Sequence, residues 1–450
     1  MTDKAIHAQC VECRLVLIEA HSMQILATAS DASPVLPRES IPAYTRLAAT
    51  LTEAIKQKYG LHTIQLAVLP DVGGNSYYAI HEIISPQEAA PRKLSFHALD
   101  ELAASEFTSE QRALVLKIMR GEASELGRFA RLGWINELRA KIGGYQDRSR
   151  WPVVQQLNQG IDFCLLSMTD ANGDKMWFKA VGEPNTREYA LTVELTRRFP
   201  AYLPKIVATI PEWNGWITEN VVGTPLHESA EIHQSEQALA ALAAMQKEAA
   251  SSIASLVPLG AKDWSCSRLL VLSAPFFEVA RQAMRAQTST LSKPLTDMEL
   301  DHLRMDIESG LVDFMSTGIP ETLLHGDVGH GNTIASPAGP VFLDWAETYV
   351  GHPFLSAEHL LADLARSNPA FSENQAALRT GYSAHWKTYA PPRELKRLVA
   401  LAPAIAAFFY GVLCWDANRK RPDPTRAWPL LRSMLRRSKH ELEQMSGVTA

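Results

Sequence analysis

The chain has 450 residues, of which 46% are hydrophobic and 21% charged, as in soluble globular proteins with sizeable cores. This length accommodates roughly three domains. Five scattered cysteines and a net charge of −5 exclude a disulfide-stapled secreted domain and fit a reducing cytoplasm. The first residues, MTDKAIHAQCVEC, have no apolar stretch of the secretory type, so we expect a cytoplasmic location.

Residues 1–92 are expected to form a small α+β accessory domain. Strands are predicted at 14–20, 24–29, 63–69 and 77–84, and a helix at 44–59 that ends at Gly60. The strand–helix–strand order is faintly similar to that of Nudix hydrolases. Since the helix lacks their acidic metal-binding cluster, we assign the domain no catalytic role.

Residues 93–149 are expected to be a helical connector. Helices are predicted at 98–104, 109–120 and 133–142. Thr108 and Gln111 have the spacing of a capping box, and Gly143 with Gly144 ends the third helix.

Residues 150–222 switch to strand patterns. Three strands are predicted before a helix at 185–199, and two more after it; the five strands are 152–160, 162–170, 175–181, 204–210 and 214–222. Asn172-Gly173 predicts a tight hairpin between the second and third strands. Glu188 shares a helix face with Leu191 and Leu195, which predicts an inward-pointing carboxylate. Asn185-x-x-Glu188 is also a capping-box spacing, so an N-terminal capping role stays open.

Residues 223–450 are expected to be mostly helical, with helices at 234–250 and 296–317. The apolar run 398–415 is long enough to cross a membrane. Pro403 and Gly411 interrupt it and charged sequence flanks it, so a buried core helix is the preferred interpretation. From Trp345 onward, 14 Lys and Arg face 9 Asp and Glu, which makes this end of the chain net basic.

The segment 321–353 places three oxygen-bearing side chains on adjacent loops. A buried strand at 322–324 precedes Asp327 and Asn332, and a returning strand at 341–343 delivers Asp344. Mg²⁺ prefers hard oxygen ligands and keeps several waters, so a carboxylate and an amide are sufficient protein ligands. The remaining Asp can orient a substrate hydroxyl and accept its proton.

This segment resembles the aminoglycoside phosphotransferase and choline kinase family, which has the protein-kinase fold. The resemblance is carried by His325-Gly326-Asp327, Asn332, Asp344-Trp345 and Gly351-x-Pro353. It implies an α+β fold with a small β-rich lobe at 150–222 and a large helical lobe at 223–450. It also implies Asp327 as the catalytic base, and Asn332 and Asp344 as magnesium ligands.

The resemblance further implies a nucleotide site. Lys179 matches the family's phosphate-binding lysine, held by Glu188 or, alternatively, by Glu194. The segment 157–162 at the junction of the first two strands, with Gly160 as its one glycine, would cover the phosphates. Backbone groups of the hinge segment at Glu219 to Val221 would meet the base.

Two departures leave the acceptor undefined. Relatives often have a polar residue two positions after the catalytic Asp, where this chain has Gly329. His330 is the next residue, and it could contact a phosphate or substrate, or face water. The family's Asp-Leu-Ala appears only at 363–365, later than expected after Pro353.

The sequence therefore predicts an ATP- and Mg-dependent phosphotransferase acting on a hydroxyl of a small molecule, with no nucleic-acid or membrane partner. An aminoglycoside is disfavoured against a neutral or anionic acceptor because a polycation needs an acidic pocket. The alternative function is a nucleotide-binding pseudokinase with a sensing or docking N-terminal domain.

Overall fold

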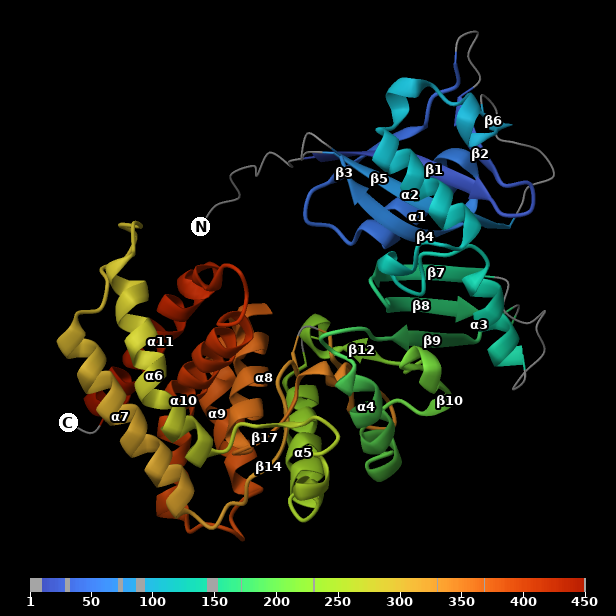
Figure 1. Cartoon of the computed structure of the whole chain (residues 1–450). Helices are drawn as coiled ribbons and strands as arrows, with labels where there is room; N and C mark the ends of the chain where they lie inside the picture. The colour runs from blue at the N-terminus through green and yellow to red at the C-terminus, as the bar shows by residue number, and fades with distance from the viewer. Residues whose placement is uncertain are drawn as a thin grey trace. The chain divides into compact units, whose positions relative to one another are not determined.

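The computed structural model describes residues 10–28, 33–71, 76–85, 94–143, 153–170, 172–229, 231–329, 331–367 and 369–448. It forms two compact units (Figure 1). The first comprises residues 1–189 and 205–220, and the second comprises 190–204 and 221–450. The fold is mixed α+β, as predicted, with the sheets concentrated in the first unit and the long helices in the second.

The N-terminal part of the first unit is a six-stranded sheet with one helix. In chain order its elements are β1 (Cys10–Glu19), β2 (Gln24–Thr28), β3 (Arg38–Pro42), α1 (Leu47–Tyr59), β4 (His62–Pro70), β5 (Ser76–Ser85) and β6 (Leu94–His97). The order across the sheet is β4-β5-β1-β2-β6, with β3 paired to β1. Sequence analysis predicted β1, β2, β4, β5 and α1, and missed β3 and β6, which are short.

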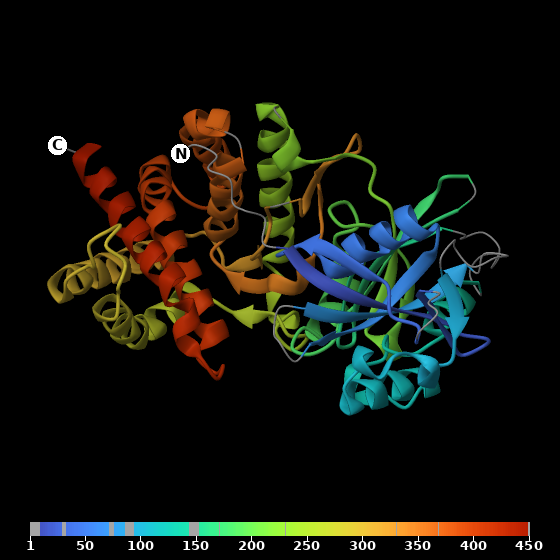
Figure 2. The same cartoon turned by 90° about the horizontal axis from the view of Figure 1, so that it is seen from above.

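The two faces of this sheet are covered by different helices (Figure 2). Leu15 and Leu17 of β1 pack with Leu51 and Ile55 of α1 in one hydrophobic cluster. Side chains on the opposite face of β1 belong to a second cluster, which also contains buried residues of the connector. This alternation is the two-residue period of a strand buried on both faces.

The connector contains two α-helices, α2 (Ser109–Arg120) and α3 (Trp134–Gly143). Thr108 and Gln111 form the predicted capping box, with bonds of 2.9 and 3.1 Å. The predicted helix at 98–104 is wrong: two three-residue 3₁₀ turns occupy 99–101 and 104–106.

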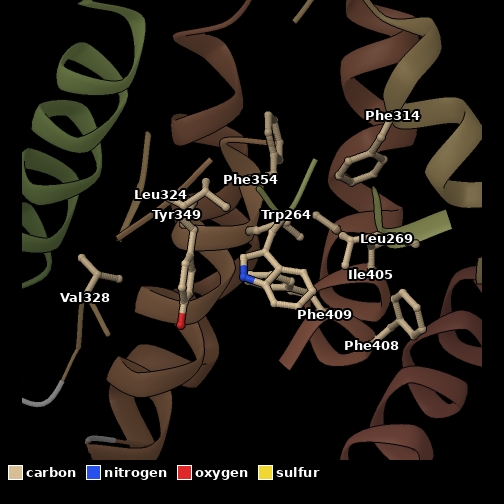
Figure 3. Close-up of a cluster of buried hydrophobic side chains, with 14 of the residues drawn as sticks. Trp264, Leu269, Phe314, Leu324, Val328, Tyr349, Phe354, Ile405, Phe408 and Phe409 are labelled. Carbon is tan, nitrogen blue, oxygen red and sulfur yellow. The ribbon is translucent and has the colours of Figure 1, made fainter. Parts of the chain in front are cut away.

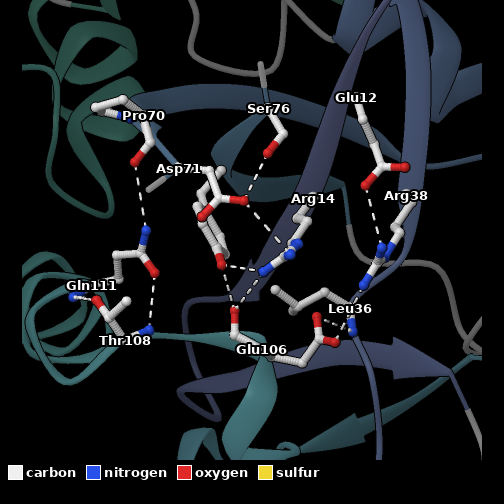
Figure 4. A network of polar contacts seen from close by, with 11 residues as sticks. Glu12, Arg14, Leu36, Arg38, Pro70, Asp71, Ser76, Glu106, Thr108 and Gln111 are labelled. Atoms are coloured by element: carbon white, nitrogen blue, oxygen red, sulfur yellow. Dashed lines mark hydrogen bonds and ion pairs between the residues drawn. The ribbon is translucent and has the colours of Figure 1, made fainter. Parts of the chain in front are cut away.

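Glu106, in the second 3₁₀ turn, fixes the connector to the N-terminal sheet (Figure 4). Its backbone carbonyl accepts hydrogen bonds from Tyr78 and Arg14, at 2.6 and 3.2 Å. Its carboxylate accepts from the Leu36 N–H and lies 3.6 Å from Arg38. These interactions satisfy a carboxylate that is only 3% exposed.

The remainder of the first unit is a five-stranded antiparallel sheet with the order β10-β11-β9-β8-β7. Its elements are β7 (Val153–Gly160), β8 (Phe163–Thr169), β9 (Lys175–Ala180), α4 (Arg187–Arg198, which continues into the second unit), β10 (Ile206–Ile210) and β11 (Gly215–Glu219). All five predicted strands and the helix are present. Gly173, at a φ of 88°, lies in the hairpin between β8 and β9.

The two sheets of the first unit are joined through their edge strands, β4 and β7. Gln156 of β7 accepts a bond from the Gln65 N–H at 2.7 Å and donates to the Gln65 carbonyl at 3.2 Å. Gln159 donates to the Leu66 carbonyl at 2.6 Å. The amide side chains thus satisfy backbone groups that an unpaired edge strand would leave exposed.

One hydrophobic cluster runs through both sheets and the connector. It includes Ile18 of β1, Trp134 of α3, Phe178 of β9 and Trp213 of the 3₁₀ turn between β10 and β11. Phe129 contacts three of these rings edge-on, with ring centroids 4.9 to 6.2 Å apart. The division of this region at residues 92 and 149 stays a prediction, since its parts share one core.

The second unit is built from long helices and two small sheets. Its helices are α5 (Ile232–Ala249), α6 (Cys266–Arg285), α7 (Asp297–Ser316), α8 (Phe354–Ser367), α9 (Pro369–Ala384), α10 (Pro392–Asn418) and α11 (Trp428–Val448). Its strands are β12 (Thr224–Pro225), β13 (Lys262–Asp263), β14 (Thr322–His325), β15 (Thr333–Ala335), β16 (Val341–Phe342) and β17 (Thr348–Gly351). The sheet orders are β12-β15-β16 and β13-β17-β14.

Helix α10 is the central helix of the second unit's core. It is long and apolar enough to cross a membrane, but 67% of its most apolar stretch is buried against neighbouring elements. Phe408 and Phe409 pack on Phe276 and Trp264, respectively (Figure 3 draws part of this cluster). The preferred interpretation of 398–415 as a buried core helix is therefore confirmed.

Candidate active site

The second unit holds the His-Gly-Asp segment at the end of β14, and His325 orients it. The imidazole accepts a hydrogen bond from the Asp327 N–H at Nδ1, 3.2 Å away, and its Nε2 lies 2.7 Å from the Leu343 carbonyl. Burial lowers the pKa of His325 to about 4, so the ring is neutral and carries its proton on Nε2. One side chain thus ties the Asp327 loop to the residue before Asp344.

Asp327 and Asn332 are brought together by a short loop. Asn332 Nδ2 donates to the Asp327 carboxylate at 2.9 Å and to its backbone carbonyl at 2.8 Å. The Asp327 side chain is 50% exposed, so it is accessible to a substrate. Because both bonds use Nδ2, the amide oxygen of Asn332 is left for another ligand.

Asp344 follows β16 in a left-handed conformation, with a φ of 58°. This backbone is uncommon for a residue other than glycine and occurs often at functional sites. The Leu343 N–H donates to the Asn332 carbonyl at 2.7 Å, which continues the β15–β16 pairing and brings Asp344 next to Asn332. The two predicted magnesium ligands therefore come from adjoining strand ends.

The donor set fits a magnesium ion that is held partly by phosphate and water. Asn332 supplies an amide oxygen and the exposed Asp344 a carboxylate. Among the residues that the structure describes, no group of three or more His, Cys, Asp or Glu forms a complete cage. Mg²⁺ bound with a nucleotide commonly uses only one or two protein ligands.

Helix α8 supports this loop from behind. Ser356 accepts from the His325 N–H at 3.0 Å and donates to the His325 carbonyl at 3.1 Å. A Cβ on Gly329 would lie 2.3 Å from the carboxylate of Asp363, which is 1% exposed. The late Asp-Leu-Ala of the sequence therefore places its Asp directly against the loop that follows Asp327, and Gly329 is required by that contact. His330 lies outside the described residues.

A cavity of about 430 Å³ opens beside Asp327. Helix α10 supplies an apolar wall, and polar side chains line the region near the loop; the polar and charged lining residues are Asp327, Glu347, Glu358, His359, Arg366, Tyr410 and Arg437. Glu358 is buried and receives two hydrogen bonds from Arg379, at 2.5 and 2.9 Å. Burial nevertheless raises the pKa of Glu358.

In the first unit, Lys179 of β9 is paired with Glu188 of α4. Lys179 Nζ lies 2.5 Å from Glu188 Oε1, and the two side chains are 13% and 1% exposed. Lys179 Nζ also lies 5.8 Å from the ring centre of Trp216, its paired residue on the neighbouring strand β11. Of the two acids considered, Glu188 is thus the one that contacts Lys179; Glu194 pairs with Arg197 and Arg198.

The segment predicted to cover the phosphates is the end of β7 and the tip of the β7–β8 hairpin. Strand β7 continues through Gly160, as the predicted strand 152–160 does, and only Ile161 and Asp162 turn the chain. Asp162, at a φ of 53°, accepts a hydrogen bond from the Arg128 N–H at 2.7 Å. The phosphate-covering role of Gly160 stays a prediction.

The predicted hinge lies where the chain passes from the first unit to the second, at Asn220 and Val221. The Glu219 N–H donates to the Lys205 carbonyl and the Asn220 N–H to the Lys175 carbonyl. The Glu219 carboxylate is 2.6 Å from Lys205 Nζ. A nucleotide base would have to use other backbone groups of this segment.

Sequence analysis missed the residues that surround Asp327 from α8 and α10. His359, Asp363 and Tyr410 are 32, 36 and 83 positions away from it. They belong to apolar helices without a local motif. The one available signal was the displaced Asp-Leu-Ala, which marked Asp363.

No protein-family model matches the chain, and no curated protein matches it. Solved structures do. A choline kinase from Cryptosporidium parvum matches at 15% identity and TM-score 0.47, over 70% of this chain and 96% of its own. A choline/ethanolamine kinase family protein from Mesorhizobium loti matches at 15% identity and TM-score 0.46, over 69% of this chain and 95% of its own.

A macrolide 2'-phosphotransferase from Brachybacterium faecium matches at 14% identity and TM-score 0.43, over 66% of this chain and 98% of its own. These proteins are of the kind that the His325 to Pro353 segment resembles. At such identities and scores they add no argument about chemistry, which rests on the residues of this chain.

Proposed function

We propose that the protein is a phosphotransferase that uses ATP and magnesium to phosphorylate a hydroxyl group of a small molecule in the cytoplasm. The observation that supports this most directly is the arrangement of Asp327, Asn332 and Asp344 on one loop and the hairpin that follows it, with an accessible carboxylate beside two oxygen donors. This donor set suits phosphoryl transfer, in which positioning and charge stabilisation dominate.

In the proposed reaction, the acceptor oxygen forms a bond to the γ-phosphorus while the bond to the leaving ADP oxygen breaks. Asp327 holds the acceptor hydroxyl and takes its proton. Neutral His325 keeps Asp327 and Leu343 in a fixed relation, since both of its ring nitrogens are used. Bound Mg²⁺, held by Asn332 and Asp344, would neutralise phosphate charge, and Lys179 would bind the phosphates. Alignment of this kind can supply roughly 7–11 kcal/mol.

The cavity beside Asp327 is the proposed acceptor pocket, and its lining favours a compound with an apolar body. Pro403, Ala406 and Ala407 give it an apolar wall. Three of its charged lining groups have ion-pair partners: Glu358 with Arg379, Arg366 with Asp363 and Arg437 with Glu441. A polycation such as an aminoglycoside stays disfavoured on the net basic charge of the chain from Trp345 onward.

The test is a panel of hydroxyl compounds, covering neutral, anionic and polycationic classes, incubated with ATP and MgCl₂. Phosphorylated product is detected by mass spectrometry and ADP by a coupled assay. Asp327→Asn is the matched control, because the amide oxygen can still accept from Asn332. We expect it to bind ATP like the wild type and to lose transfer by about 10²-fold or more.

The alternative, a nucleotide-binding pseudokinase, has a distinct outcome. Wild-type protein would then show ATP-dependent thermal stabilisation, yet no compound in any class would be phosphorylated. The presence of all three oxygen donors disfavours this alternative.

A further inference from the structure

His359 has a partly buried imidazole that points toward Asp327, and it takes part in no motif. It lies on α8, and its side chain is 16% exposed. Its Nε2 atom is buried and has no hydrogen-bond partner among the described residues. A buried polar atom without a partner costs about 1–3 kcal/mol, so its retention calls for an explanation.

The ring of His359 is held in one orientation. It stacks on Tyr410 of α10, with ring centroids 4.6 Å apart and planes inclined by 28°. The Tyr410 hydroxyl in turn donates to the Gly326 carbonyl at 3.2 Å, one residue before Asp327. Both rings line the same cavity as Asp327. The imidazole is therefore fixed relative to the proposed base.

The separation of the two polar atoms fits a third atom between them. His359 Nε2 lies 3.9 Å from Asp327 Oδ1, which is too long for a direct hydrogen bond. One oxygen atom can lie within about 2.8 Å of both. A hydroxyl there would donate its proton to Asp327 and accept one from the imidazole, and a second lone pair would remain for attack.

We propose that His359 is a positioning residue that holds the reacting hydroxyl of the acceptor against Asp327. This inference rests on the proposed function and adds the group that recognises the acceptor. The competing interpretation is a weak ion pair, in which protonated His359 merely modulates Asp327. That interpretation predicts no recovery of activity in His359→Gln, because the glutamine side chain carries no charge.

The test compares two variants with an acceptor that the wild type phosphorylates. His359→Phe keeps a ring on Tyr410 and removes the polar atom, and His359→Gln restores an N–H at about the same reach. We expect His359→Phe to lose about tenfold in kcat/KM for the acceptor, and His359→Gln to recover most of it. The KM for ATP should stay within about twofold of wild type, because the proposed contact of His359 is to the acceptor and not to the nucleotide.

Equal losses of kcat/KM in His359→Phe and His359→Gln would overturn the proposal in favour of the ion pair, and full activity of His359→Phe would overturn it as well. A measurement on wild-type protein covers the case in which a variant does not fold. With ¹⁵N-labelled histidine, the Nε2 resonance of one buried histidine should shift on acceptor saturation but not with ATP alone; no shift overturns the proposal. If the wild type phosphorylates nothing, the proposed function itself fails, which is a different result.

Discussion

Lys179 and Glu188 form an ion pair across β9 and α4, with Nζ and Oε1 2.5 Å apart and Glu188 almost fully buried. A buried pair contributes little net stability, but the removal of one partner leaves an uncompensated charge. The pair is therefore a sensitive probe of both folding and the proposed phosphate-binding role of Lys179.

We expect Glu188→Ala to lower the free energy of unfolding by about 3 to 5 kcal/mol. The double variant Lys179→Met/Glu188→Leu should recover most of that stability and none of the transfer activity. Urea unfolding and ADP release measure the two effects. Glu194→Ala is the control, since the Glu194 side chain is 21% exposed against 1% for Glu188, and we expect its loss to cost only about 1 kcal/mol. Restored activity in the double variant would contradict the role of Lys179.

Gly329 faces the buried carboxylate of Asp363, and a methyl group there would lie 2.3 Å from Asp363 Oδ2. Since both groups are confined by α8, we expect Gly329→Ala to displace the loop after Asp327 and to lower kcat by tenfold or more.

The matched control for this change is Gly381→Ala in α9, where an added Cβ meets nothing within 4 Å. It should leave kcat unchanged and stabilise the helix by up to about 1 kcal/mol. Steady-state kinetics and thermal melts report both changes. Wild-type kcat in Gly329→Ala would show that the loop yields easily.

The buried His352 should make the free energy of unfolding depend on pH. Burial lowers its pKa to about 3, against an ordinary value of 6.5, and neither ring nitrogen has a partner among the described residues. The folded state therefore favours the neutral ring. The contribution of neutral His352 to the free energy of unfolding is complete above pH 6.5, and it is lost as the pH falls toward the pKa of the folded state.

We expect His352→Phe to reduce the slope of unfolding free energy against pH between pH 6.5 and 5 by up to about 1.4 kcal/mol per pH unit. A phenyl ring suits the site because Phe314 and Phe354 surround it, with ring centroids 4.4 and 5.4 Å away. Urea midpoints at several pH values measure the slope. His81 and His325 are also buried and have lowered pKa values, so they should maintain part of the pH dependence of the unfolding free energy in this variant.

The contacts of Gln156 lead us to expect that the N-terminal sheet stabilises the five-stranded sheet, in which β9 carries Lys179. Its amide makes two bonds to the backbone of Gln65 and is 2% exposed. We expect Gln156→Ala to lower the free energy of unfolding by about 1 to 3 kcal/mol, since backbone groups lose their partners. Gln57→Ala, which breaks an exposed bond to Glu53, should change it by less than about 0.5 kcal/mol. Equal effects in the two variants would show that the strand edges are hydrated.

Local sequence patterns were sufficient to predict most of the helices and strands. The strand periodicity predicted β7 to β11, and Thr108 with Gln111 predicted the start of α2. Local patterns failed where tertiary contacts decide the structure: 98–104 forms 3₁₀ turns that anchor on the N-terminal sheet through Glu106.

The amino-acid sequence by itself determined which chemistry to expect, because Asp327, Asn332 and Asp344 lie within 18 positions on one strand–loop–hairpin segment whose geometry is local. Only the tertiary structure decided what surrounds them. Helices α8 and α10 bring His359, Asp363 and Tyr410 to the loop, and the choice of Glu188 over Glu194 depends on the packing of α4 against β9. Such contacts join residues far apart in the chain, and they follow from burial of apolar helix faces, which carries no motif.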